Sequence, residues 1–345
     1  MTTTQLPVWK RPSRPLGLAA YTVVLIVFGL LLAACQPATV ATAPAAATLS
    51  ATVAPLVKLR LAMLPIIDAL PFYVAQKDGL FSKYGVEVEF IPVSSAAERD
   101  QIIAAGQADG MINDLVSVTL YNRDAVQVQT VRFARVADSN TAMYRVLAAK
   151  DSGLKTPADL AGVPIGMSQA TIIDYVTSRL LENEGLTAEQ IQAVAVPKLP
   201  ERMALLGSGE LKAATLPEPF GSIAIEAGAV IIVDDSKYPE YGNSVISFRK
   251  AVIDQNPQAV MSLLSAVEEA VTAINQNAET YRPLLGEYKL VPENMQASYP
   301  MPAFPAASVP SEAQFADVVA WARARSLIDQ DQAYSDAISA AYLPK

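Results

Sequence analysis

Residues 57–93 read VKLRLAMLPIIDALPFYVAQKDGLFSKYGVEVEFIPV, and they set the pattern for most of the chain. Two short apolar runs, KLRLAML and VEVEFIPV, stand on either side of a helical stretch, ALPFYVAQKDG. The alternation continues through the β-rich runs DGMI (109–112) and VQVQTVRF (126–133), with helical stretches between them. Strands that alternate with helices predict parallel sheets covered by helices on both faces, so we expect an α/β fold.

A second alternating stretch extends from about residue 144 to residue 234. When the sequence is shifted by 103 residues, Glu98-Arg99 falls on Glu201-Arg202 and Gly106 falls on Gly209. One interpretation is that each half contains a strand–helix–glycine–strand unit in the same register. The alternative is that the match reflects features that all α/β proteins share.

The segment after Asn243 has a different character. It begins with one more predicted strand and a long amphipathic helix, and residues 290–310 hold five prolines, which excludes a regular helix there. No third alternating sheet follows, so we expect this tail to pack on the first lobe. Lobe one is then formed by residues 57–141 and 244–345, and lobe two by residues 142–243.

The N-terminus has the features of a secretory signal. In residues 1–34, three basic residues precede a 19-residue apolar run that ends in Leu-Ala-Ala-Cys at Cys35. This ending resembles a bacterial lipobox, which implies cleavage before Cys35 and lipidation of that residue; a retained transmembrane anchor is the alternative. Residues 35–56, which are rich in Ala, Thr and Pro, fit a tether. Since positive charges stay inside, we expect the rest of the chain at the extracytoplasmic face of the cell membrane.

The composition excludes several classes of function. The 345 residues include no histidine and one cysteine, which rules out Ser-His-Asp triads, Cys-His dyads, His-ligated metals and an intrachain disulfide. The net charge of −8 offers no basic patch of the kind that nucleic acids require. We therefore expect no metal, no cofactor and no nucleic-acid partner.

Several motifs together resemble a known family, the solute-binding proteins of ABC importers that serve sulfonates, taurine, nitrate, thiamine-precursor pyrimidines and riboflavin. The matching segments are AMLP (62–65), PFYVAQKDGLF (71–81), YGVEV (84–88), AGQAD (105–109), SGLKTPADLAG (152–162) and LPEPF (216–220). The resemblance implies the type II periplasmic-binding-protein fold, in which two α/β lobes are joined by two crossover strands and hold a ligand in the cleft. It also implies delivery of the ligand, chemically unchanged, to a membrane permease with its ATPase. The related fungal thiamine-pyrimidine synthases use a histidine and a cysteine cluster, which this chain lacks, so we expect no enzyme of that type.

Ligands of open α/β sheets sit beyond the carboxyl ends of the strands and at helix N-termini. The candidate ligand residues on the corresponding loops are Asp68, Phe72, Tyr73, Ser94, Asn113, Asp114, Tyr144, Ser168, Thr171 and Glu218. Each has a structural alternative: Asp68 and one of Asn113 and Asp114 fit helix caps, and Phe72 has the spacing of a core residue, which is the favoured interpretation for it. Glu218 also suits the first turn of a helix.

The predicted loops carry carboxylates and aromatic rings rather than Arg or Lys. Such residues suit a flat heterocycle with N–H groups, so riboflavin is the favoured ligand and a thiamine-type pyrimidine the next. The first alternative is a sulfonate, taurine or nitrate ligand in the same type of importer. The second is an extracytoplasmic enzyme that works with carboxylates alone, and the third is a sensor or structural lipoprotein without a ligand. We expect a monomer.

Overall fold

The computed structural model describes residues 56–345. The predicted signal, the proposed lipid attachment at Cys35 and nearly all of the tether lie outside the described residues. Within residues 56–345, none of the helices combines the length and the apolar character needed to cross a bilayer.

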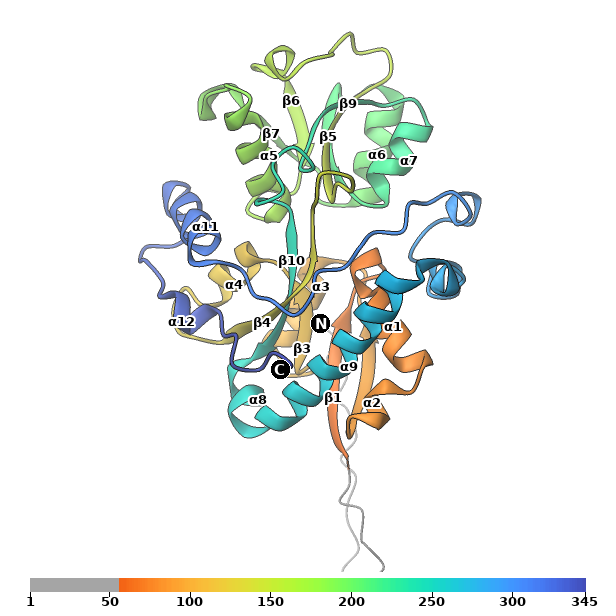
Figure 1. The fold of residues 1–345 in the computed structure, drawn as a ribbon. Helices are drawn as coiled ribbons and strands as arrows, with labels where there is room; N and C mark the ends of the chain where they lie inside the picture. Colours follow the sequence, from red (N-terminus) through yellow and green to blue (C-terminus); the bar gives the residue numbers. More distant parts are fainter. Residues whose placement is uncertain (1–55) are drawn as a thin grey trace, which may run out of the picture. The chain divides into compact units, whose positions relative to one another are not determined.

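The first sheet has five strands in the order β2-β1-β3-β10-β4 (Figure 1). Strands β1, β2 and β3 run parallel to one another, whereas β10 runs antiparallel to both β3 and β4. The strands are β1 (Val57–Met63), β2 (Val86–Pro92), β3 (Gly110–Asn113), β4 (Val128–Val136) and β10 (Asn243–Arg249). The sheet therefore takes its strands from two segments that are more than 100 residues apart.

The second sheet repeats this arrangement in the order β7-β6-β8-β5-β9. Strand β6 runs parallel to β7 and β8, and β5 runs antiparallel to β8 and β9. The strands are β5 (Tyr144–Ala148), β6 (Pro164–Met167), β7 (Gln192–Ala195), β8 (Ala213–Pro217) and β9 (Val230–Asp234). We call the first sheet with its helices lobe one, and the second with its helices lobe two.

Two segments of chain join the sheets. The first crossover segment, residues 137–143, leads from β4 to β5, and the second, residues 235–242, leads from β9 to β10. Both enter lobe two next to each other, because β5 and β9 are paired there, and both enter lobe one next to each other, because β4 and β10 are paired. The described chain is thus an α/β fold of two lobes.

The 103-residue offset holds in the structure. It places the start of α3 (Ala96–Ala104) on the start of α6 (Leu199–Ser208), and the start of β3 on the start of β8. Gly106 and Gly209, which fall on each other, both have a left-handed φ, at +70° and +80°. Each lobe therefore turns from helix to strand in the same way, and glycine permits that turn.

The remaining helices cover the two sheets. In lobe one, the 20-residue α9 buries one face on α1 and contributes to the first hydrophobic core. The helices are α1 (Leu70–Lys77), α2 (Leu80–Lys83), α4 (Leu115–Tyr121), α5 (Ile172–Asn183), α7 (Phe220–Glu226), α8 (Lys250–Gln255), α9 (Pro257–Gln276), α10 (Leu284–Glu287), α11 (Glu312–Ala324) and α12 (Tyr334–Ala337).

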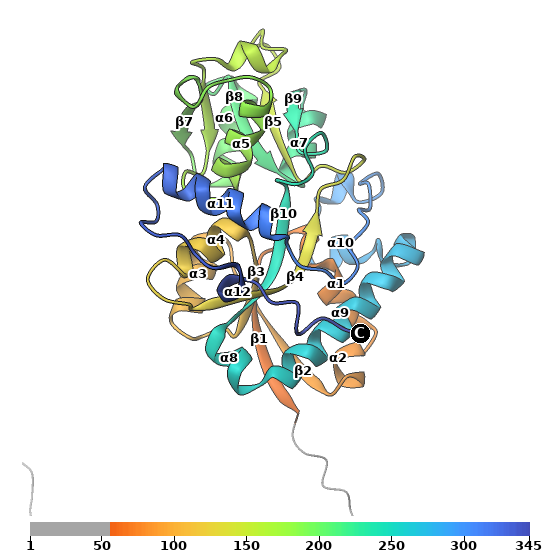
Figure 2. The same ribbon diagram turned by 60° about the vertical axis from the view of Figure 1, so that its left-hand side comes forward.

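Helix α11, in the C-terminal tail, contacts both lobes, whereas we expected the tail to pack on lobe one alone. It lies between α4 of lobe one and α5 of lobe two (Figure 2). The hydroxyl of Tyr175 on α5 donates to Asp317 of α11 at 2.8 Å, and Arg325 just after α11 donates to Ser178 of α5 at 2.7 Å. The ring of Trp321 meets that of Tyr175 edge to face, with centroids 5.5 Å apart. A second hydrophobic core therefore runs from one lobe into the other.

Candidate functional site

Polar side chains gather at the edge of the first sheet that leads into the crossover segments. Asn113 ends β3, Arg135 is near the end of β4, and Asn243 and Ser244 begin β10, which lies between β3 and β4. Ser244 is paired with Arg135 in the strand register, and the residue after it is paired with Asn113. These four side chains are only 2–4% exposed, so they form a buried polar group at this edge of the sheet.

Arg135 is the charged side chain of this group, and Asp68 is its ion-pair partner. Its Nη1 lies 3.5 Å from an Asp68 carboxylate oxygen, and its Nη2 donates to the Ala142 carbonyl at 3.4 Å. Both distances are at the long end of the range for hydrogen bonds. Its Nε–H has no acceptor among the described residues. Burial of a guanidinium with so few close partners is costly unless a ligand supplies acceptors.

Lobe two faces this group with an ion pair between Arg145 on β5 and Glu218 just after β8. Glu218 also accepts hydrogen bonds from Ser222 at 2.7 Å and from the Tyr299 hydroxyl at 2.9 Å. Tyr299 belongs to the core of lobe one, so its hydroxyl joins the two lobes. Burial lowers the pKa of Arg145, although the carboxylate of Asp234, 3.8 Å from its Nε, partly offsets this effect.

Asp235 ties the two crossover segments together. One of its carboxylate oxygens accepts the backbone N–H groups of Met143 at 2.8 Å and Tyr144 at 3.1 Å. The other oxygen, Oδ2, is buried without a hydrogen-bond partner among residues 56–345, and it lies so close to Gly242 that any Cβ there would collide with it. Burial raises the pKa of Asp235 to about 7, although the two N–H groups act in the opposite direction.

Tyr144 and Asp114 complete the buried group. Burial raises the pKa of the Tyr144 hydroxyl well above its ordinary value, and the nearby carboxylates of Asp114 and Asp68 raise it further. Asp114 caps α4 by accepting the Ser117 N–H at 2.8 Å, and burial raises its pKa. Asp114 therefore fulfils the capping alternative and also lies close to Tyr144.

The start of α5 forms a separate polar cluster in lobe two. Thr171 caps the helix by accepting the Ile173 N–H at 3.2 Å, and its hydroxyl donates to the Ser168 carbonyl at 2.7 Å. The Ser168 hydroxyl accepts a hydrogen bond from the fully buried Arg202. No acidic side chain of residues 56–345 forms an ion pair with Arg202, and burial lowers its pKa to about 10.

Arg202 has a counterpart in lobe one at the 103-residue offset. Arg99 donates to the Ile112 carbonyl at 3.3 Å, and Arg202 donates to the Thr215 carbonyl at 2.8 Å. Residues 112 and 215 are themselves 103 positions apart, so the two arginines anchor equivalent strands. This repeat in the sequence was a signal for Arg202, which the sequence prediction of site residues missed.

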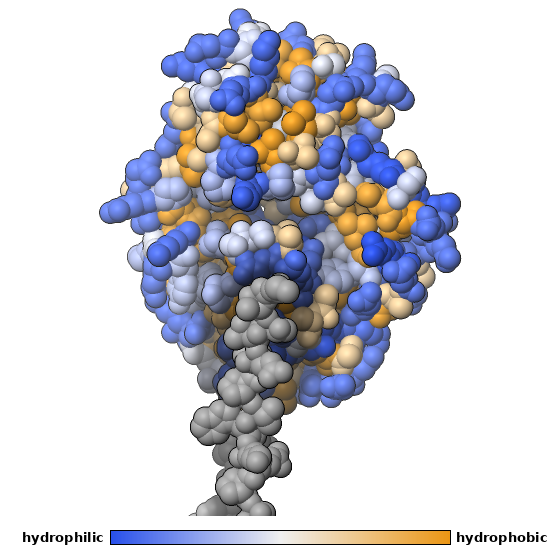
Figure 3. Space-filling view, turned by 180° about the vertical axis from the view of Figure 1, so that it is seen from behind, coloured by the Kyte–Doolittle hydropathy of each residue, from blue (hydrophilic) through white to orange (hydrophobic). Residues whose placement is uncertain are grey.

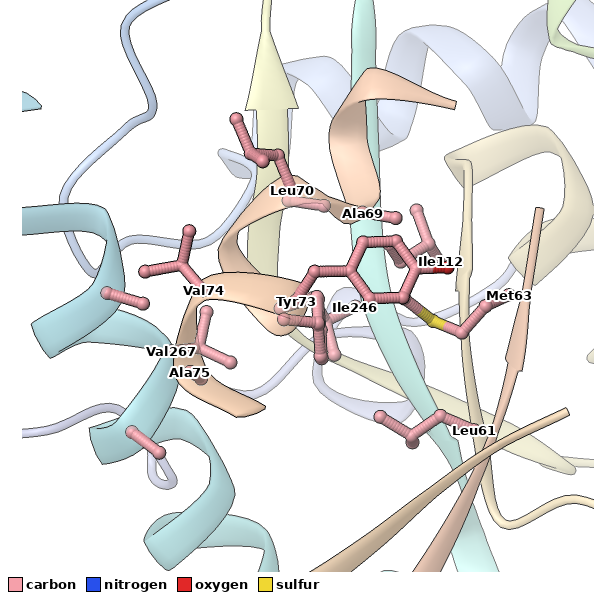
Figure 4. Close-up of a cluster of buried hydrophobic side chains, with 14 of the residues drawn as sticks. Leu61, Met63, Ala69, Leu70, Tyr73, Val74, Ala75, Ile112, Ile246 and Val267 are labelled. Carbon is pink, nitrogen blue, oxygen red and sulfur yellow. The ribbon is translucent and has the colours of Figure 1, made fainter. Parts of the chain in front are cut away.

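The other candidates lie away from the crossover segments. Phe72 is 1% exposed and meets Phe90 edge to face. Tyr73 stacks on Tyr288 with ring centroids 3.8 Å apart, and Figure 4 shows it within the first hydrophobic core. Ser94 is exposed and donates its hydroxyl to Glu98 at 2.6 Å. The structure thus brings together Asp68, Asn113, Asp114, Tyr144 and Glu218, while their contact with a ligand stays a prediction.

Sequence analysis missed five residues of the buried group: Arg135, Asp235, Asn243, Ser244 and Tyr299. The first four lie in or beside the crossover segments, where polar residues interrupt apolar runs. That interruption was an available signal for Asp235, Asn243 and Ser244, whereas Arg135 lies within a run that reads as an ordinary strand. Tyr299 lies in the proline-rich segment, and its local sequence gives no signal for the site.

A groove of about 480 Å³ lies elsewhere in lobe two, between α6 and α7. Met203, Leu206 and Ile223 line it, and it contains none of the candidate ligand residues. Lobe two forms the upper part of the view in Figure 3, where hydrophobic residues gather on its surface. Among residues 56–345 no cluster of three His, Cys, Asp or Glu side chains is placed to hold a metal ion.

Comparison with known proteins identifies the family. The family model described as "NMT1/THI5 like" matches residues 67–280, which is more than half of the chain. The chain belongs to the NMT1/THI5-like family.

Two relatives of this NMT1/THI5-like protein are binding proteins for small anions, and a third is a putative biosynthesis protein. It is 25% identical over 247 residues to the nitrate/nitrite binding protein NrtA of Nostoc sp., covering 65% of this chain and 56% of NrtA. It is 23% identical over 246 residues to the bicarbonate-binding protein CmpA of Synechococcus elongatus, and the match covers 64% of this chain and 54% of CmpA. A putative thiamine biosynthesis protein of Haemophilus influenzae is 29% identical over 129 residues, covering 37% and 40%. The chain spans about half the length of these curated relatives.

Solved structures establish the fold. A putative periplasmic sulfonate-binding protein SsuA of Methylobacillus flagellatus aligns with a TM-score of 0.67 at 21% identity, covering 84% of this chain and 93% of that one. The aliphatic sulphonate binding protein SsuA of Escherichia coli aligns with a TM-score of 0.67 at 17% identity, covering 82% and 92%. The expected periplasmic-binding-protein fold is therefore confirmed.

Proposed function

We propose that this protein is the solute-binding component of an ABC importer, and that it captures a small oxyanion between its lobes and releases it unchanged to a permease with its ATPase. The family, the fold and the ligands named for NrtA, CmpA and SsuA support this proposal. The same relatives favour the alternative ligand class of the sequence analysis, and they give no support to riboflavin or a pyrimidine.

The buried Arg135 is the observation that carries the choice of an anion. It lies beside the crossover segments with two long contacts, one of them an ion pair with Asp68, and its Nε–H has no acceptor among the described residues. An oxyanion would give this guanidinium a charge-assisted hydrogen bond, which is among the stronger interactions available to a small ligand. Because Arg135 is in lobe one and Arg145 in lobe two, an anion in contact with both would favour the closed arrangement of the lobes.

The aromatic residues give a physical reason for the change from the riboflavin prediction. A flavin would need free ring faces to stack on, but Tyr73 already stacks on Tyr288 and Phe72 is enclosed by the first core. Tyr144 is buried among charged groups rather than open to a large ring. The site offers charge and hydrogen bonds, and it offers little aromatic surface.

Replacement of Arg135 tests the proposed function. Arg135→Gln should weaken binding of the tightest-bound member of a set of nitrate, hydrogencarbonate, taurine and ethanesulfonate by about 30-fold, because a charge-assisted hydrogen bond contributes about 2 kcal/mol. Isothermal titration calorimetry measures the change. Arg123→Gln is the matched control, since Arg123 is exposed and pairs only with its neighbour Asp124. If none of the four anions binds the unaltered protein, or if riboflavin binds more tightly than all of them, the oxyanion proposal is wrong.

We also propose that the protein is attached to the outer face of the cell membrane by a lipid on Cys35, with residues 36–56 as a tether. The support is the lipobox-like ending of the apolar run. Mass spectrometry of the protein isolated from its native membrane should show an N-terminal Cys35 that carries acyl chains. Cys35→Ser should leave the chain uncleaved and without lipid, and an intact Met1 or Thr2 in the unaltered protein would contradict the proposal.

A further inference from the structure

We infer that the ligand of this site carries at least one N–H or O–H donor in addition to its oxyanion oxygens. This inference rests on the proposed function and narrows its substrate class. Hydrogencarbonate and an aminoalkanesulfonate satisfy the description, whereas nitrate and a simple alkanesulfonate offer acceptor atoms alone. The basis is the pattern of buried polar atoms that have no partner among the described residues.

Buried donor groups without a partner indicate that the ligand carries oxyanion oxygens. The Nε–H groups of Arg135 and Arg145 are both buried without a hydrogen-bond acceptor in the part of the chain that the structure describes. The two side chains come from different lobes but lie near the same crossover segment: Arg135 donates to the Ala142 carbonyl, and Arg145 follows three residues later on β5. An oxyanion at this position supplies the acceptor atoms that these donors lack.

Buried acceptor atoms without a partner indicate that the ligand also carries a hydrogen-bond donor. The amide of Asn243 is oriented by its Nδ2, which donates at 3.5 Å to the Tyr241 carbonyl, a group that can only accept. The Asn243 Oδ1 is buried without a donor among the described residues, and Asn113 Oδ1 is in the same position. Asn113 and Asn243 lie at the ends of adjacent strands, close in register to Arg135.

The two sets of atoms together determine the chemistry of the ligand. An anion without hydrogens would satisfy the arginines, but it would leave the buried oxygens unpaired and would place its own negative charge near them. A site whose buried polar groups are built to pair with a ligand N–H or O–H discriminates strongly against an analogue that lacks that group. We therefore expect a preference of at least about tenfold for the donor-bearing member of a matched pair of anions.

Two matched ligand pairs test this inference by calorimetry at pH 8. Hydrogencarbonate and nitrate are both planar oxyanions of three oxygens, but only the first carries a hydrogen. Taurine and ethanesulfonate share a sulfonate on a two-carbon chain, but only taurine carries an ammonium group. Within the pair that binds more tightly, the member that carries the hydrogen-bond donor should bind at least about tenfold more tightly than the other member. That pair also shows whether the donor is the O–H of hydrogencarbonate or the ammonium group of taurine.

The possible results separate the two proposals. If nitrate or ethanesulfonate binds as tightly as its partner, the donor inference is overturned while the oxyanion function stands. If none of the four ligands binds, both the donor inference and the oxyanion function are wrong.

Variants of Asn243 test which atom receives the donor. Asn243→Val should reduce the preference within the tighter pair by at least about threefold and leave the affinity for the donor-free member almost unchanged, because only the acceptor is lost. Asn243→Asp keeps the acceptor and should keep the preference, which provides a second measurement if the valine variant does not fold. Asn277→Val, at an exposed asparagine without a side-chain hydrogen bond at its cap, is the matched control. An unchanged preference in a folded Asn243→Val protein, or a lost preference in Asn243→Asp, would contradict the assignment.

Discussion

Raising the pH from 5 to 8 should destabilise the folded protein by about 3 kcal/mol through Asp235 alone. Burial raises the pKa of this carboxyl from 3.8 to about 7, so the folded state holds a proton that the unfolded state has already released. The stabilisation is fully present below pH 4, and it is lost as the pH rises through 7. The expected loss between pH 5 and 8 follows from the two pH units over which only the folded state is protonated.

Denaturant unfolding of the unaltered protein and of Asp235→Asn at pH 5, 6, 7 and 8 measures this effect. The asparagine side chain keeps an acceptor for the N–H groups of Met143 and Tyr144 but does not titrate, so the variant should lose about 3 kcal/mol less stability across this range than the unaltered protein. Asp234→Asn is the matched control at the neighbouring, less buried carboxylate, and it should keep the steep dependence. If the free energy of unfolding changes with pH in the same way for the unaltered protein and for Asp235→Asn, Asp235 is not the group that causes the pH dependence.

Asp109→Ala should lower the free energy of unfolding by about 3 kcal/mol. Asp109 accepts hydrogen bonds from the backbone and side chain of Arg60 on β1 and from Arg249 on β10, at 2.8 to 3.1 Å. Burial alone would raise the pKa of Asp109, but the hydrogen bonds from the two arginines outweigh it and hold the pKa below its usual value. Removal of the carboxylate leaves two guanidinium groups beside each other without their shared partner.

Urea unfolding at pH 7 measures this change, with Asp124→Ala as the control. Asp124 is largely exposed and pairs only with its neighbour Arg123, so its loss should leave the unfolding midpoint almost unchanged. Equal midpoints for Asp109→Ala and the unaltered protein would mean that the Arg60–Asp109–Arg249 network contributes little. Asp109→Asn keeps part of the hydrogen bonding, so its unfolding midpoint should lie between those of Asp109→Ala and the unaltered protein.

The fold could be predicted from the sequence because its determinants are local. Alternating apolar runs and helical stretches mark the strands and helices, and the glycines at positions 106 and 209 mark two equivalent turns. The family resemblance then supplied the connection of the two lobes. The contacts of α11 could not be predicted, because an apolar helix face is compatible with either lobe.

The site was predicted only in part, because its composition depends on strand pairing between distant segments. Asp68 lies in the loop after β1, Asn113 ends β3 and Glu218 directly follows β8, so the rule about carboxyl ends located them. Arg135 lies within the run VRFARV, which reads as an ordinary strand, and its burial follows from its pairing with Ser244, more than 100 residues later. The predicted roles of Phe72 and Tyr73 rested on residue type, and the sequence could not show that Phe90 and Tyr288 occupy their faces.

The position of α11 has a consequence for the order in which the protein folds. Tyr175 and Asp317, which join α5 to α11, are 142 residues apart, so this contact closes a long loop. Contacts that close such loops form late and slowly. Until they form, the apolar faces of α4 and α5 that α11 covers stay open to water and to other chains. Nascent protein is therefore most prone to self-association in the interval before α11 packs against α4 and α5.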